Sequence, residues 1–288
     1  MAAALALMAS GKLHRYGELG GQPSEVSALE AEFAAELGDK YCVALNSCGS
    51  AMFVALKAAG VKPGDAVLSN CFTLAPVPGA IAHAGARPLL VDVTDDCTID
   101  LADIERKAQA SGAKTLLLSH MRGHIADMPA LMAVCRRHGV QVIEDCAHTM
   151  GAGWAGRATG TWNQRHGWMA AALQAEPHLR LPQRPADEQF VASSIQFSLV
   201  GLRRDQIEYA VAACAERAVH IKWFGADEPV GFTSVWRHWR YFGDAQALPR
   251  AERVLGGLCD MRLPLTLTQA DCVAIGAVIC SALSAVGP

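Results

Sequence analysis

The sequence lacks several features that would assign it to a specialised class of protein. Its ten cysteines form no CxxC pair and no regular spacing, so they are expected to be small core residues in a reducing cytoplasm. No apolar run approaches the length of a membrane span. The net charge of −3 and the absence of a basic, aromatic-rich cluster argue against nucleic acid as a partner. We expect a soluble, cytoplasmic protein.

The composition of the chain favours a large folded core. Hydrophobic residues make up 51% of the 288 positions and charged residues 18%, which argues against disorder. This length exceeds that of a usual single core, so two domains, or one α/β domain with an appendage, are expected.

Strand and helix patterns alternate through the first half of the chain. After a helix over 24–37, capped by Ser24, the pattern predicts strands over 41–45, 66–68, 88–93, 115–119 and 140–145, and helices over 51–59, 76–84, 101–110 and 128–138. Repeated units of this length predict a parallel, doubly wound sheet.

After a glycine-rich loop over 151–160, the pattern of strands and helices changes. Helices over 162–173, 205–217, 249–255 and 268–283, and strands over 193–199, 219–224 and 260–263, predict a smaller α+β domain.

One of these strands ends in two acids. Its apolar run from Val140 leads into Glu144 and Asp145, and His148 follows three residues later. Ligands of an open parallel sheet bind beyond the carboxyl ends of its strands, so Asp145 could pair with a cationic ligand nitrogen and His148 could reach the same ligand. The alternative is a strand that ends in solvent with incidental charges.

Two other polar features follow predicted strands. Asn46–Ser50 is a small-residue turn between a strand and a helix, a geometry that can bind phosphate, although small residues also cap helices without any ligand. His120 and His124 follow the strand over 115–119. Without a third ligand nearby we interpret them as strand-end or crevice residues, and predict no metal site.

Several short segments occur together in the order typical of one known family. These are Asn46–Ala51, Lys62–Asp65, Cys71–Ala75, Gly85–Pro88, Gly123–Met128, Ile143–His148 and Gly156–Thr161. They resemble the large domain of the DegT/DnrJ/EryC1/StrS family, which consists of fold-type-I, pyridoxal-phosphate-dependent aminotransferases, many acting on nucleotide-linked keto sugars. Lys222–Gly225 and Leu263–Leu265 resemble the small domain of the same family.

The resemblance implies a fold and a division of the chain. The fold class is α/β, with the large domain of a PLP-dependent transferase (aspartate aminotransferase, fold type I) and a small α+β C-terminal domain. The large, cofactor-binding domain would cover residues 1–161, truncated, and the small domain residues 162–288.

The resemblance also implies roles for five residues in binding pyridoxal phosphate. Cys48 and Gly49 would offer backbone N–H groups to the phosphate, although many relatives have threonine at the position of Gly49. Leu74 stands where many relatives carry an aromatic side chain that stacks on the pyridine ring. Asp145 would pair with the pyridine nitrogen, and His148 would lie beside the ring.

The chain departs from the family pattern after Thr161. In the family, two strands and the Schiff-base lysine follow, whereas here Trp162 begins a region that belongs much farther along. No lysine lies between Asp145 and Lys222. Lys222 falls on a small-domain strand, so we interpret it as structural or solvent-facing, and His166 lacks the motif by which some relatives replace the lysine with histidine. No catalytic residue is therefore assigned.

The missing segment predicts an incomplete parallel sheet, because the absent strands would lie between those over 140–145 and 41–45. Exposed strand edges invite association, so a homo-oligomer is expected.

We predict a family member that binds pyridoxal phosphate without a covalent bond and is catalytically impaired. If active, it would take a nucleotide-sugar or other small keto substrate and an amino donor. The alternative is a non-catalytic remnant, or a partner subunit of a complete homologue. A dinucleotide-binding protein is disfavoured because Asn46–Ala51 lacks the GxGxxG glycines.

Overall fold

The computed structural model describes residues 2–11, 13, 23–154, 162–185, 188–189, 193–230, 235–239, 246–264 and 266–286. The chain divides into two compact units, Met1–Ala51 and Met52–Pro288. The domain boundary predicted at Thr161 lies outside the described residues, as does most of the loop over 151–160. No helix in the described part of the chain has both the length and the apolar character needed to span a membrane.

The first unit is helical. It contains α1 (Ala2–Ser10), α2 (Glu25–Leu37) and the first turn of α3 (Cys48–Ala58). The Ser24 hydroxyl caps α2 as predicted, by accepting the N–H of Ser27. The predicted strand over 41–45 is wrong: this segment pairs with no strand among the described residues, and Tyr41 and Val43 are exposed. An apolar run becomes a strand only where a neighbour can accept its hydrogen bonds.

The second unit contains a four-stranded parallel sheet. Its strand order is β2-β1-β3-β4, formed by Arg87–Val91, Ala66–Asn70, Thr115–Ser119 and Gln141–Asp145. The helices that alternate with these strands are α4 (Pro76–His83), α5 (Leu101–Ser111) and α6 (Met128–His138). The predicted parallel sheet is confirmed, and β4 is its last strand within the described residues.

Hydrophobic packing covers both faces of this sheet. Leu116 and Leu118 pack in one cluster with side chains of α5 and α6, whereas Leu117 packs in another with side chains of α3 and α4. Successive residues of a strand point to opposite faces, so β3 is buried along its whole length.

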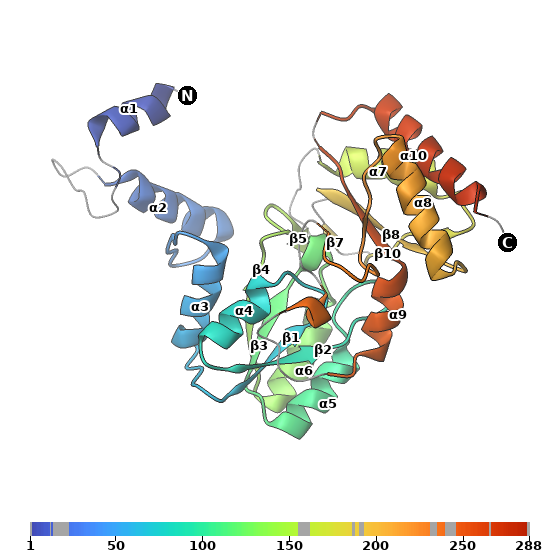
Figure 1. Cartoon of the computed structure of the whole chain (residues 1–288). Coiled ribbons are helices and arrows are strands. Elements are labelled where there is room, and N and C mark those ends of the chain that lie inside the picture. Colours follow the sequence, from blue (N-terminus) through green and yellow to red (C-terminus); the bar gives the residue numbers. More distant parts are fainter. Residues whose placement is uncertain are drawn as a thin grey trace. The chain divides into compact units, whose positions relative to one another are not determined.

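A second, antiparallel sheet has the strand order β6-β8-β10-β9. Its strands are Leu179–Arg180, Ser194–Leu199, Leu258–Arg262 and Lys222–Trp223, so the strand predicted over 219–224 is shorter than expected. The helices α7 (Trp162–Leu173), α8 (Arg204–Glu216) and α10 (Gln269–Ser284) lie beside this sheet (Figure 1). Their side chains form one core with those of β8 and β10. The remaining elements are α9 (Pro249–Gly257), the 3₁₀ turns η1 (Met121–Gly123) and η2 (Trp236–His238), and the short pair β5 (Gly153–Trp154) and β7 (Glu188–Gln189).

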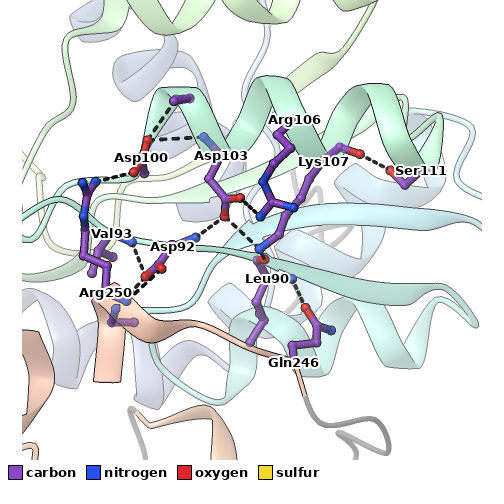
Figure 2. Close-up of polar contacts among 12 residues, drawn as sticks. Leu90, Asp92, Val93, Asp100, Asp103, Arg106, Lys107, Ser111, Gln246 and Arg250 are labelled. Carbon is purple, nitrogen blue, oxygen red and sulfur yellow. Dashed lines mark hydrogen bonds and ion pairs between the residues drawn. The ribbon is translucent and has the colours of Figure 1, made fainter. Parts of the chain in front are cut away.

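A polar network joins β2 to the segment that begins α9 (Figure 2). The Asp92 carboxylate accepts the N–H groups of Arg250 (3.1 Å) and Ala251 (2.6 Å) in the first turn of α9. At the outer edge of β2, the Gln246 side-chain amide accepts the N–H of Leu90 (2.8 Å) and donates to the carbonyl of Pro88 (3.0 Å). The amide thus satisfies backbone groups that a further strand would otherwise take.

Candidate functional site

The strand end that carries Asp145 is fixed by its neighbour β3. Ser119 pairs with Asp145 in the parallel register, and the N–H of His120 donates to the Asp145 carbonyl over 3.1 Å. The Asp145 side chain is only 9% exposed, and its Oδ1 accepts the N–H of Ala147 at 3.1 Å. Asp145 is therefore a buried carboxylate that its own turn holds in place. The alternative, a strand that ends in solvent with incidental charges, does not describe this residue.

His148 lies in the same turn and has a defined tautomer. Its Nδ1 accepts the backbone N–H of Arg122 over 2.7 Å, so the neutral ring carries its proton on Nε2. Burial and the Arg122 guanidinium lower the pKa of His148, and the negative charge of Asp145 opposes them. His148 is thus a neutral donor near neutral pH.

Arg122 joins the two sheets of this unit. Its guanidinium forms an ion pair with Asp260 of β10 at 2.9 Å, with the two side chains only 1% and 3% exposed. The Asp260 carboxylate also accepts Nε2–H of Gln196 at 2.6 Å. The backbone of Arg122 is left-handed, with φ of 58°, and in this conformation its N–H points at His148.

The two histidines that follow β3 do not act as a pair. His124 is buried, and its Nε2 lies 2.9 Å from Oε1 of Gln196 in the interior. His120 is also buried, but its Nε2 lies 2.9 Å from Oε2 of Glu144, which is partly exposed. The interpretation of both as strand-end residues is confirmed by their positions, and they belong to separate environments.

The other three predicted cofactor residues are Leu74, Cys48 and Gly49. Leu74 follows β1 and packs against the cluster that contains Phe72 and Trp236. Cys48 and Gly49 belong to the first unit, where they are the first two residues of α3. The Ser47 hydroxyl caps this helix by accepting the N–H of Ser50 at 3.1 Å. The roles of all five residues toward a cofactor stay predictions.

Sequence reasoning missed Arg122 and Asp260. A left-handed arginine has no sequence signature, because it follows from the contacts made after folding. Asp260 did give a signal: it interrupts the apolar strand Leu258–Met261, where an acid requires a buried partner.

Substitution of Asp260 by Asn should destabilise the protein. The change leaves the buried Arg122 guanidinium without its counter-charge, at a cost of about 3–5 kcal/mol in the free energy of unfolding. Urea denaturation followed by circular dichroism measures this loss. Asp205→Asn, in an ion pair whose acid is 72% exposed, is the matched control and should change stability by less than about 0.5 kcal/mol. Equal effects of the two substitutions would contradict the structural role of Asp260.

Stability should also fall as the pH drops from 7 to 5. Burial lowers the pKa of His124, His148 and His166, the last to about 4. Unfolded histidine titrates near pH ~6.5, so below that pH the unfolded chain binds more protons than the folded one and the free energy of unfolding decreases. The raised pKa of Glu188 acts in the opposite direction, because the folded chain then binds an additional proton as the pH falls. This is one carboxyl group against three histidines. Urea melts at both pH values test it, and His124→Gln should reduce the fall; a stability independent of pH would contradict the assignment.

Comparison with known proteins identifies the family. The model of the DegT/DnrJ/EryC1/StrS aminotransferase family, whose enzymes are PLP-dependent, matches residues 3–166. The spore coat polysaccharide biosynthesis protein SpsC of Bacillus subtilis is 39% identical over 127 residues, which is 44% of this chain and 32% of that protein. The UDP-N-acetyl-3-dehydro-alpha-D-glucosamine 3-aminotransferase of Acidithiobacillus ferrooxidans is 38% identical over 136 residues, 47% of this chain and 37% of that protein.

The chain thus matches about a third of the length of these curated relatives. Among solved structures, 3-amino-5-hydroxybenzoic acid (AHBA) synthase aligns with a TM-score of 0.84 at 17% identity, covering 97% of this chain and 94% of that one. This likeness shows a shared fold, that of the PLP-dependent aminotransferases of fold type I. Since the family model covers more than half of the sequence, the chain belongs to the DegT/DnrJ/EryC1/StrS aminotransferase family.

Proposed function

We propose that this protein binds pyridoxal phosphate without a covalent bond and that it lacks lysine-dependent transamination. The observation that carries the proposal is the buried Asp145 carboxylate at the carboxyl end of β4, with the Nε2–H donor of His148 in the same turn. A pyridine nitrogen is a group that such a carboxylate recognises, because a protonated ring nitrogen donates a charge-assisted hydrogen bond to it. The residues of this strand end fit the cofactor.

Each residue has a distinct task in this proposal. When bound, pyridoxal phosphate supplies an electron sink for reactions at an amine-bearing carbon. Asp145 would hold the proton on the pyridine nitrogen, and His148 would donate from Nε2. Cys48 and Gly49, at the positive end of α3, would offer backbone N–H groups to the phosphate. Leu74 would offer apolar contact without the defined geometry of a stacked aromatic ring.

The chemistry that the chain lacks is proton transfer by a lysine amine. No lysine lies between Lys114 and Lys222, a span that includes Asp145 and His148. Lys222 is on β9 of the antiparallel sheet, where its Nζ donates to the carbonyl of Val230 over 2.5 Å. The general base that usually serves these reactions is therefore not supplied from the family position. If the chain has activity, a keto sugar and an amino donor are the substrates that its named relatives suggest.

Titration with pyridoxal phosphate tests binding. Absorbance and quenching of tryptophan fluorescence should show saturable binding to the full chain, and Asp145→Asn should weaken it about ten- to a hundredfold through loss of a charge-assisted hydrogen bond. Asp227→Asn, which changes an exposed acid that pairs with Arg204, is the control and should leave the affinity unchanged.

Borohydride separates the two parts of the proposal. After reduction and removal of small molecules, no stoichiometric adduct should remain on any lysine. A lysine adduct that disappears in Lys222→Arg would contradict the non-covalent mode of binding. It would not contradict the proposal that the chain binds pyridoxal phosphate. Failure of the wild-type chain to bind the cofactor at all would contradict the proposal as a whole.

A role as a partner subunit is the second candidate. The specific observation in its favour is the outer edge of β4, which no described strand covers, whereas the edge of β2 is occupied by Gln246. An uncovered edge of a half-buried strand can accept a strand from another chain. Either a second copy or a complete homologue could supply it.

Association through this edge predicts a concentration-dependent oligomer. Sedimentation velocity should show species larger than the monomer, and Gln141→Lys, at an exposed position of β4, should shift the population towards monomer, because a charge at a strand edge disfavours pairing. Val273→Lys, at an exposed position of α10, is the control. A wild-type chain that stays monomeric over a hundredfold range of concentration, with one sharp thermal transition, would contradict this role.

A further inference from the structure

Three chemically different metal ligands meet at the carboxyl ends of β3 and β4. His120 follows β3, Glu144 lies in β4 and Cys146 directly follows it. One ligand atom from each of these residues lies within 4.8 Å of the other two. Nε2 of His120 and Oε2 of Glu144 are already 2.9 Å apart, close to the separation of two ligands on one small ion.

The three ligands are held on a rigid frame. The N–H of His120 donates to the carbonyl of Asp145, which fixes the imidazole-bearing turn against β4. The carbonyl of Cys146 accepts the N–H of Thr149 at 2.9 Å, and the Thr149 hydroxyl lies 3.3 Å from the same oxygen. Glu144 and Cys146 flank Asp145, and both are exposed where Asp145 is buried. The cluster therefore lies on the opposite side of the strand end from the Asp145 carboxylate.

A second, independent observation concerns the buried side of His120. This imidazole is 3% exposed, and its Nδ1 has no hydrogen-bond partner among the described residues. Oε2 of Glu188 is likewise buried without a hydrogen-bond partner among the described residues. In metal sites a ligating histidine typically donates its other N–H to such a carboxylate. Nδ1 of His120, which has no such partner among the described residues, leaves this second contact of a ligating imidazole open.

We propose that His120, Glu144 and Cys146 bind a divalent zinc-type ion, through imidazole Nε2, carboxylate oxygen and thiolate sulfur. This mixed nitrogen, oxygen and sulfur set suits Zn²⁺ or Co²⁺, whereas Mg²⁺ and Ca²⁺ require oxygen ligands. Three protein ligands leave a fourth tetrahedral position, which faces solvent because Glu144 and Cys146 are exposed.

Binding releases one proton. Zinc binds the thiolate form of cysteine, so the Cys146 thiol gives up its proton when the ion binds. The metal–sulfur bond forms as the S–H proton leaves to water, and no electron is transferred. Zinc affinity should therefore increase with pH.

Titration of the purified full chain with Co²⁺, without added pyridoxal phosphate, tests the site. A thiolate-to-cobalt charge-transfer band in the near ultraviolet and visible bands of a four-coordinate ion should appear at one equivalent, and Zn²⁺ should displace them. Cys146→Ser should abolish the charge-transfer band. Glu144→Gln, at a partly exposed position, should weaken binding about tenfold or more through loss of a ligand.

The matched control is Glu105→Gln. Glu105 lies 3.2 Å from His138 in a similar carboxylate–histidine pair, but it belongs to no three-ligand cluster in the described structure. This variant should bind Co²⁺ as the wild type does. Absence of a charge-transfer band in the wild type, its persistence in Cys146→Ser, or equal losses in Glu105→Gln and Glu144→Gln would overturn the proposal. Since Glu144 is 44% exposed, its variant tests the site even if the cysteine variant misfolds.

Discussion

A buried ion pair of Arg122 connects the parallel sheet of the second unit to its antiparallel sheet. The guanidinium is buried against Asp260, and the backbone N–H of the same residue holds His148. A buried charge without its partner is expensive, so the Arg122–Asp260 pair fixes which part of β10 faces the turn after β3. The tautomer of His148 follows from that position. A contact between sheets thereby defines the chemistry of a side chain next to Asp145.

The end of β4 illustrates how one strand can serve two environments. Alternation along the strand directs the Asp145 carboxylate into the buried turn and leaves Glu144 and Cys146 on the other side. Register with β3 adds His120 to the second group. In the two proposals above, the same three consecutive residues contribute to sites of different chemistry, one for a protonated ring nitrogen and the other for a zinc-type ion.

Much of the fold could be predicted from the sequence because its local signals agree with its tertiary structure. The strands from β1 to β4 are short apolar runs, and the helices between them begin at caps such as Asp100 and Asp127 and end at glycines in left-handed conformation. The segment over 41–45 carries the same apolar signal but forms no strand, because a strand also needs a partner, and partnership is a property of the whole sheet. Asp145 and His148 could be predicted to lie at the carboxyl end of a strand because an apolar run precedes them in the sequence. Arg122, Asp260 and the approach of His120 to Glu144 depend on contacts between distant segments, which no local pattern contains.

Gln246 has a consequence for the order in which the protein folds. The side chain that satisfies the outer edge of β2 lies 156 residues beyond Leu90. Domains generally fold as their chains emerge from the ribosome, N-terminal parts first. The parallel strands are therefore complete in length long before the amide that finishes their border has been synthesised. Throughout that interval the outer edge of β2 lacks the side-chain amide that satisfies it in the folded protein.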